Sequence, residues 1–127
     1  MICLDANYLI GGVSEQRPES RHLLAWSEAG EKFCTAAPAW YEFLCGPVTQ
    51  EQIETMRAFL SGGIIPFDEQ HAAIAARLFN AIKRPRHLRV DIMIAATAIN
   101  RKAPLATLNR THFEPLVSHG LDLIGCD

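Results

Sequence analysis

Three carboxylates stand at positions in the sequence where an apolar segment ends or a helix begins. Asp5 closes a short apolar run, Glu42 lies just inside an expected helix, and Asp91 opens an almost wholly apolar helix. A carboxylate beside apolar surface is expensive to bury unless a partner neutralises its charge. Because no basic residue stands near Asp5 or Glu42 in the sequence, the three acids together predict a bound metal ion.

Two further polar residues, Thr107 and Asn109, are expected at the same place. Thr107 is the last residue of a short apolar segment with the pattern of a strand, and Asn109 follows two residues later. Carboxylate and amide oxygens are the ligands that hard ions such as Mg²⁺ and Mn²⁺ prefer. A metal held in this way can lower the pKa of a bound water and stabilise charge on a leaving oxygen. The residue types therefore favour metal-dependent phosphoryl chemistry.

Each of these residues also has a purely structural interpretation. Asp5 could cap a turn beginning near Asn7, Asp91 could be a first-turn acid favoured by the helix dipole, and Glu42 could face solvent. Asn109 is of a type common in turns. The prediction of a metal site therefore depends on the set. The sequence shows no recognisable arrangement of Ser or Cys with His and an acid, although side chains distant in the sequence could still form one, and neither pair of glycines has the spacing of a phosphate-binding loop.

Short apolar segments of strand length alternate along the chain with segments of helical pattern. Strands are expected at Ile2–Leu4, Phe33–Ala36, Ile64–Phe67, Leu105–Thr107 and Leu121–Ile124. Helices are expected at Glu19–Ala29, Ala39–Cys45, 49–60, Glu69–Ile82 and 88–101. This alternation predicts an α/β fold with a parallel sheet and right-handed crossovers. In such a sheet functional groups gather at the carboxyl ends of the strands, where Asp5 and Thr107 would lie.

Composition sets the class of protein. The chain has 127 residues, of which 49% are hydrophobic and 20% charged, as expected for a single globular domain over residues 1–127. No apolar run reaches the roughly 20 residues of a membrane-spanning helix, and the first residues lack a basic leader, so we expect a cytoplasmic protein without a membrane partner. The four cysteines form no C-x-x-C pair, which favours buried free thiols over a zinc site.

Charge is distributed unevenly although the net charge is only −2. Residues 77–113 contain eight basic residues and one acid, or +7, whereas the remainder contains four basic and thirteen acidic residues, or −9. Such asymmetry is compatible with a face that binds a polyanion. A solvated helix surface followed by a basic loop would give the same pattern. The presence of Asp91 inside the basic block favours the first interpretation.

Four segments of the sequence resemble those of PIN-domain ribonucleases, and in particular the VapC-like toxins of type II toxin–antitoxin pairs. They are Ile2-Cys3-Leu4-Asp5-Ala6-Asn7, Pro38-Ala39-Trp40-Tyr41-Glu42-Phe43, Asp91-Ile92-Met93-Ile94-Ala95-Ala96-Thr97-Ala98, and Leu105-Ala106-Thr107-Leu108-Asn109 followed by His112-Phe113. The intervals between Asp5, Glu42, Asp91 and Asn109 are 37, 49 and 18 residues, which suit a compact member of that family. The resemblance spans the whole chain.

The resemblance implies a single PIN-like domain with a central five-stranded parallel sheet flanked by helices. It implies Mg²⁺- or Mn²⁺-dependent cleavage of RNA, with Asp5, Glu42 and Asp91 as the metal-binding carboxylates. Asn109 would support the catalytic site directly or through a water. Asn7 and Thr107 would orient the carboxylates by hydrogen bonds.

Two positions depart from the family pattern. Ala6 stands where the family often has threonine, so a hydroxyl beside Asp5 is missing. Asn109 stands where some relatives carry a further acid, so any second metal would be held more weakly. Neither departure predicts an inactive protein.

The resemblance also gives the basic block an expected role in binding RNA phosphates. The candidate residues are Lys83, Arg84, Arg86 and Arg89 in the loop that leads to Asp91, and Arg110 and His112 on the other side. Phosphate contacts of this kind give affinity and salt dependence with little sequence information. The implied partners are an RNA substrate, a cognate antitoxin bound at apolar surface of the early helices, and a second copy of the chain in a homodimer.

Other functions remain open at this stage. A nuclease of RNA maturation would share the chemistry and lack an antitoxin. A degenerate domain could bind RNA or protein without catalysis, although all three acids are present. A phosphorylation receiver domain is also α/β, but it needs an acidic pair after its first strand, and Asp5 has no acidic neighbour before Glu15.

Overall fold

The computed structural model describes residues 1–14 and 17–125, and within them five short strands form one sheet. The strands are β1 (Ile2–Leu4), β2 (Phe33–Ala36), β3 (Ile64–Ile65), β4 (Leu105–Ala106) and β5 (Leu123–Ile124). Their order across the sheet is β3-β2-β1-β4-β5, and every neighbouring pair is parallel. The predicted five-stranded parallel sheet is confirmed, with β1 at its centre.

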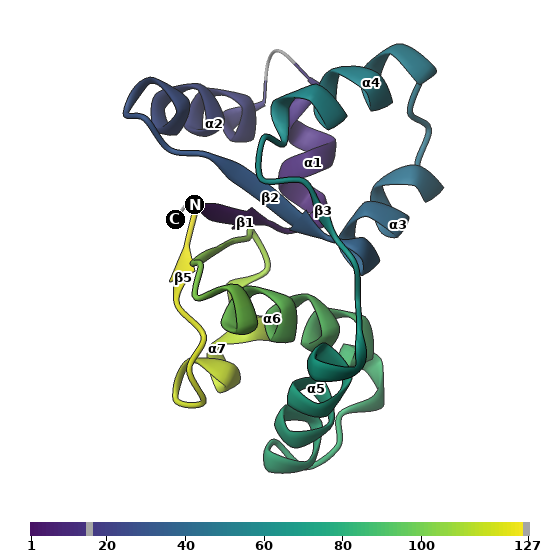
Figure 1. Ribbon diagram of the computed structural model, residues 1–127, viewed down its shortest axis with the longest axis vertical. Coiled ribbons are helices and arrows are strands. Elements are labelled where there is room, and N and C mark those ends of the chain that lie inside the picture. The colour runs from purple at the N-terminus through teal and green to yellow at the C-terminus, as the bar shows by residue number, and fades with distance from the viewer. Residues whose placement is uncertain (15–16, 126–127) are drawn as a thin grey trace.

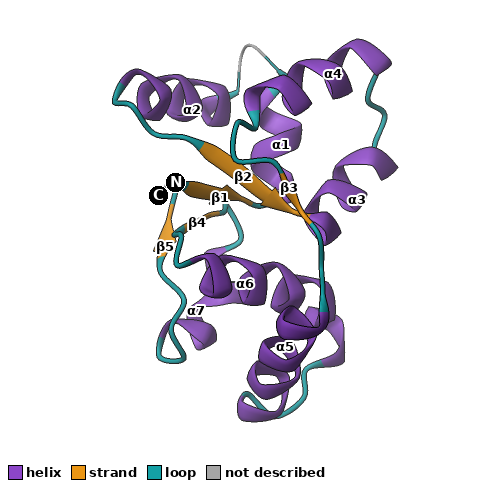
Figure 2. Cartoon of the chain, viewed as in Figure 1, coloured by secondary structure: helices purple, strands orange, loops and turns teal. Residues whose placement is uncertain are grey.

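Helices cover the sheet from two sides, as Figures 1 and 2 show. The helices are α1 (Ala6–Gly12), α2 (Pro18–Glu28), α3 (Ala37–Cys45), α4 (Gln50–Phe59), α5 (Glu69–Ala81), α6 (Arg89–Arg101) and α7 (Arg110–Val117), with a short 3₁₀ helix at Arg86–Leu88. In the view of Figure 1, α1 to α4 lie above the sheet, and α5 to α7 lie below it. No helix within the described ranges combines the length and the apolar character needed to cross a bilayer.

The central strands are buried on both faces, as expected when helices cover a parallel sheet from both sides. Cys3 of β1 lies opposite Cys34 of β2 and Leu105 of β4, and all three side chains are inaccessible to solvent. The predicted burial of free thiols holds for these two cysteines, whereas Cys45 at the end of α3 is exposed. Cys126 lies outside the described residues.

Local signals in the sequence set the ends of several helices. Thr49 and Gln52 form a capping box at the start of α4, with the Gln52 N–H donating to the Thr49 hydroxyl at 3.1 Å. The Asp68 carboxylate accepts a hydrogen bond from the His71 N–H at 3.1 Å at the start of α5. Pro38 occupies the first turn of α3, where its missing N–H leaves no helical bond unmade.

Two helices have no counterpart among the predicted elements, because each contains residues that usually end a helix. Helix α1 ends in Gly11-Gly12, and a Cβ on Gly11 would lie 2.8 Å from the Cβ of Glu19 in α2. Close packing of α1 against α2 therefore favours glycine at position 11. Helix α7 contains Pro115, yet it folds because Phe113 and Leu116 are buried in the core. The observed third, fourth and fifth strands are also shorter than predicted.

Candidate metal centre

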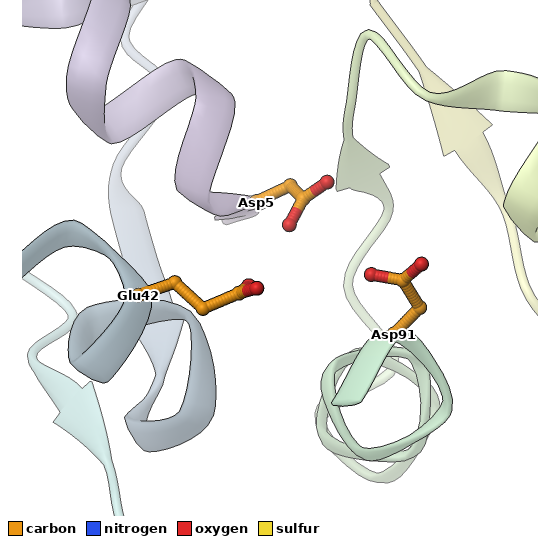
Figure 3. A group of neighbouring side chains, drawn as sticks. All are labelled: Asp5, Glu42 and Asp91. Carbon is orange, nitrogen blue, oxygen red and sulfur yellow. The ribbon is translucent and has the colours of Figure 1, made fainter. Parts of the chain in front are cut away.

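Asp5, Glu42 and Asp91 come together at the carboxyl ends of the central strands. One carboxylate oxygen of each lies within 4.8 Å of one oxygen of the other two. Figure 3 shows the three side chains pointing toward one another from three different elements. The structure thus joins residues that are 37 and 49 positions apart in the sequence.

The sheet topology accounts for this convergence. Asp5 follows β1 directly, and its backbone N–H donates to the Ala106 carbonyl at the end of β4 at 3.0 Å. Glu42 lies in α3, which begins immediately after β2 at Ala37. Asp91 lies in the first turn of α6, the helix that crosses back to β4. Since β2, β1 and β4 are adjacent and parallel, their associated acids meet at one edge.

Hydrogen bonds hold the Asp5 carboxylate in place. Its Oδ1 accepts from the Ala6 N–H at 2.8 Å, so Asp5 also caps α1. Its Oδ2 accepts from the Thr107 hydroxyl at 2.7 Å and from the Asn7 amide at 3.4 Å. With a residue exposure of 3%, Asp5 is the deepest of the three acids.

The residues around Asp5 are themselves held by the segment that follows β4. The Asn7 Oδ1 accepts from the Leu108 N–H at 3.3 Å, and the Thr107 hydroxyl accepts from the Asn109 N–H at 3.0 Å. The geometry of Asn7 and Thr107 therefore fits the orienting role expected of them. Asn109 contributes through its backbone, and its exposed side chain makes no hydrogen bond within the described part of the chain.

Asp91 has a partner that sequence reasoning missed. The Nδ1 atom of His112, in the first turn of α7, lies 3.0 Å from Oδ2 of Asp91. The sequence predicted His112 only as a contact for RNA phosphates. The two residues are 21 positions apart in the sequence, and no local pattern predicts that they pair. The pairing depends on helix α7, which the sequence did not predict.

The electrostatics of the site favour a cation. Burial raises the pKa of Asp5, although the hydrogen bonds from Thr107 and Ala6 oppose this change, and the nearby charge of Asp91 adds to it. Burial also raises the pKa of Glu42, and the charges of Asp5 and Asp91 act in the same direction. Asp5 and Glu42 therefore resist ionisation at this site, and a bound cation would relieve the repulsion between the carboxylates.

The donor set fits a small hard divalent ion. Two oxygen ligands of Mg²⁺, each about 2.1 Å from the ion, lie at most about 4.2 Å apart. The 4.8 Å limit that encloses the three oxygens is close to this span. Mg²⁺ also retains several waters, so one carboxylate can act through a water. Asp5, Glu42 and Asp91 are the residues that would hold such an ion.

The basic loop, defined here as residues 83–89, connects α5 to α6. Its last residue, Arg89, is the first residue of α6 and stands two positions before Asp91. Lys83 and Arg84 both have positive φ angles, of 68° and 59°. The Arg84 guanidinium hydrogen-bonds to the Asn80 side chain and lies 5.1 Å from the centre of the Phe79 ring. This arrangement fixes the turn that ends α5.

The basic side chains of this loop are exposed and have no acidic partner in the described residues, so they could contact phosphate groups. They are those of Lys83, Arg84, Arg86 and Arg89. Arg89 lies 5.8 Å from the centre of the Phe79 ring, and Arg110 is partly buried at the start of α7. Among the predicted phosphate contacts, only His112 has a carboxylate partner in the part of the chain that the structure describes.

Comparison with solved structures finds the same fold in several other proteins. The chain resembles a chain of VapBC2 from Rickettsia felis bound to a promoter DNA fragment, with a TM-score of 0.77, 19% identity and 100% coverage of both chains. It resembles a chain of FitAcB from Neisseria gonorrhoeae with a TM-score of 0.72 and 23% identity, over 98% of this chain and 96% of that one. A toxin–antitoxin complex from Klebsiella pneumoniae gives a TM-score of 0.70 and 26% identity, covering 89% and 90%.

No curated protein matches the sequence. The family model of the PIN domain matches residues 2–114, which include all three converging acids and the helices that carry them. This match covers most of the chain. The five-stranded parallel sheet and the cluster of Asp5, Glu42 and Asp91 are also the features that the resemblance of the four sequence segments implied. The chain therefore belongs to the PIN domain family, and its fold is that of the VapBC and FitAB relatives.

Proposed function

We propose that this protein is a metal-dependent endoribonuclease, a VapC-like toxin that cleaves cellular RNA in the cytoplasm and is neutralised by a cognate antitoxin. The observation that carries the proposal is the convergence of three carboxylate oxygens within 4.8 Å at the carboxyl edge of a PIN-domain sheet. Nuclease activity is general for this family, and the acidic cluster supplies the ligands such an activity needs. Mg²⁺ and Mn²⁺ are the proposed ions.

The residues of the proposed site would have different roles. A divalent ion bound here would activate a water and stabilise negative charge on the scissile phosphate. Asp5, fixed by three hydrogen bonds, would provide the rigid ligand, while Glu42 and Asp91 would close the site from α3 and α6. Asn7 and Thr107 would keep the Asp5 carboxylate in its orientation. Asn109 would support the site through the loop that precedes α7.

RNA is the proposed substrate because a strongly basic segment flanks the acids. The cations of the basic loop, with Arg110, would attract the phosphate backbone to a centre that is itself negative. Without these cations the cluster of acids would repel a polyanion. This argument favours a nuclease over a phosphatase for small molecules, which needs no extended basic surface.

An antitoxin is the proposed protein partner, and an apolar groove is the proposed place for it. The groove has a volume of about 350 Å³ between α1, α2 and α4. Its apolar lining comes from Leu23, Leu24, Met56 and Phe59. Because the Klebsiella pneumoniae relative was solved as a toxin–antitoxin complex, we propose that an antitoxin helix lays its apolar face in this groove. Formation of a homodimer stays a prediction.

The decisive test compares the wild-type protein with Asp5→Asn and Asp91→Asn on total RNA. We expect cleavage with Mg²⁺ or Mn²⁺, no cleavage with EDTA, and a loss of at least roughly 100-fold in rate for either variant. Asp122→Asn, an exposed acid before β5, is the matched control and should cleave as the wild type does. Equal rates for all four proteins, or cleavage that survives EDTA, would show that the acidic cluster is not the active site.

A further inference from the structure

His112 and Asp91 form the one hydrogen bond between side chains that joins α7 to the candidate metal centre within the described residues. His112 Nδ1 lies 3.0 Å from Asp91 Oδ2, with side-chain exposures of 48% and 17%. An ionised carboxylate has no proton to give, so the imidazole must donate through Nδ1–H. The contact therefore fixes which nitrogen carries the proton on the side that faces Asp91.

The Asp91 carboxylate depends on this contact for its orientation. Helix α6 begins without a side-chain cap, and no other hydrogen bond to the Asp91 side chain occurs within the described ranges. By contrast, the Asp5 carboxylate accepts three hydrogen bonds. An acid with several free rotamers loses entropy when it must hold an ion, and a fixed partner removes part of that cost in advance.

One short segment thus orients two of the three acids. Thr107 donates to Asp5 from the end of β4, and five residues later His112 donates to Asp91 from the first turn of α7. The Asn109 N–H, which donates to the Thr107 hydroxyl, lies between them in the chain. The β4–α7 segment therefore couples the two carboxylates through covalently linked residues.

We propose that His112 is a positioning residue that holds the Asp91 carboxylate ready for the divalent ion, in place of the RNA-phosphate contact expected from the sequence. This inference rests on the proposed function, because it requires that the three acids bind an ion. The ring acts through Asp91 and is not itself a ligand of the ion. Second-sphere partners of this kind typically contribute 10- to 100-fold to metal affinity or activity.

Substitutions at position 112 separate this role from others. His112→Ala removes the donor and should weaken Mn²⁺ binding by roughly 10-fold or more. His112→Asn places an amide N–H close to the position of Nδ1 and should recover most of the affinity. His112→Gln places its amide near the position of Nε2 and should behave like alanine. His119→Ala, at an exposed histidine beyond α7, is the control that leaves Mn²⁺ binding unchanged.

The experiment measures Mn²⁺ dissociation constants without RNA, by calorimetry and by the Mn²⁺ electron paramagnetic resonance signal, with thermal unfolding in EDTA as a check on folding. The order wild type, Asn, then Gln and Ala supports the proposal. Equal affinity for wild type and His112→Ala overturns it, as does an Asn variant as weak as Ala. If the wild-type protein itself binds no Mn²⁺, the proposed function fails, and that result is distinct from a change confined to position 112.

Discussion

Glu42 differs from the other two acids in that no hydrogen bond holds its side chain within the described residues, whereas Asp5 and Asp91 are anchored by Thr107 and His112. Its carboxylate nevertheless faces both other acids, and burial together with their charges raises its pKa. Without a metal ion, the ionised Glu42 therefore opposes folding. With an ion bound, the same charge becomes favourable.

This conflict predicts opposite effects of Glu42→Gln with and without metal. In EDTA at pH 7 the variant should melt about 2 °C above the wild type, as expected from removing roughly 0.5 kcal/mol of partly screened repulsion. With excess Mn²⁺ the order should reverse, because binding at 100 times the dissociation constant adds about 2.7 kcal/mol to the wild type. Thermal unfolding followed by circular dichroism measures both differences.

The difference in melting temperature between Glu42→Gln and the wild type in EDTA should depend on pH in a direction that the raised pKa of Glu42 fixes. A carboxyl group whose pKa is raised on folding contributes stability that is complete below its unfolded pKa, near 4.3, and is lost as the pH rises through the folded pKa. The gap between the variant and the wild type in EDTA should therefore open between about pH 4 and pH 7. A gap that does not depend on pH would contradict the assigned cause.

At the scale of elements, the basic loop and the β4–α7 segment approach the acids from different sides. The loop is ordered by its own contacts, since Arg84 is held by Asn80 and by the face of Phe79. Two successive residues with positive φ carry a steric cost of about 1–2 kcal/mol each. A loop kept in this conformation presents exposed cations next to α6, which suits phosphate binding better than a mobile tail would.

The loop leads to a prediction about salt dependence. In an Asp5→Asn background that cannot cleave, replacing Arg84 and Arg86 by alanine should weaken RNA binding and lower the slope of log affinity against log salt by about 1.4, or 0.7 for each lost contact. Fluorescence anisotropy at several salt concentrations measures the slope. The double variant Arg21→Ala, Lys32→Ala removes equal charge elsewhere and should leave it unchanged. Equal slopes for the two double variants would remove the loop from the RNA-binding surface.

At the scale of the whole molecule, helix α1 connects the metal centre with the apolar groove. Asp5 caps the N-terminus of α1, while Gly12 at its other end forms part of the groove. A helix of seven residues is about 10 Å long, so a segment bound in the groove could extend to the acids. This arrangement would allow an antitoxin to block the site while its main contacts lie in the groove.

Because the proposed antitoxin groove lies apart from the acids, a substitution in the groove should weaken antitoxin binding without affecting RNA cleavage. Leu24 is 59% exposed on α2 and lines the groove, so Leu24→Asp should leave RNA cleavage unchanged and weaken binding of the antitoxin by at least tenfold. Val117→Asp, which places the same charge at an exposed apolar position on α7, is the matched control. Co-expression with the antitoxin tests this prediction, because only the Leu24 variant should remain toxic. Neutralisation of both variants would place the antitoxin elsewhere.

The sequence by itself determined much of the local structure, since strands, caps and most helices depend on neighbouring residues. The helices that begin near Thr49 and Asp68 and the apolar strands at Ile2–Leu4 and Phe33–Ala36 have short-range patterns, and they form as predicted. Helices α1 and α7 were not predicted, because their stability comes from packing that compensates for glycine and proline.

The acids Asp5, Glu42 and Asp91 could be nominated from the sequence, because each stands at the end of a recognisable element. Only the tertiary structure decided that their oxygens lie within 4.8 Å, that burial raises the pKa of Asp5, and that His112 holds Asp91. The physical reason is that these properties depend on distances between segments that the sheet brings together. Such distances follow from the packing of the whole core and leave no trace in any local stretch of sequence.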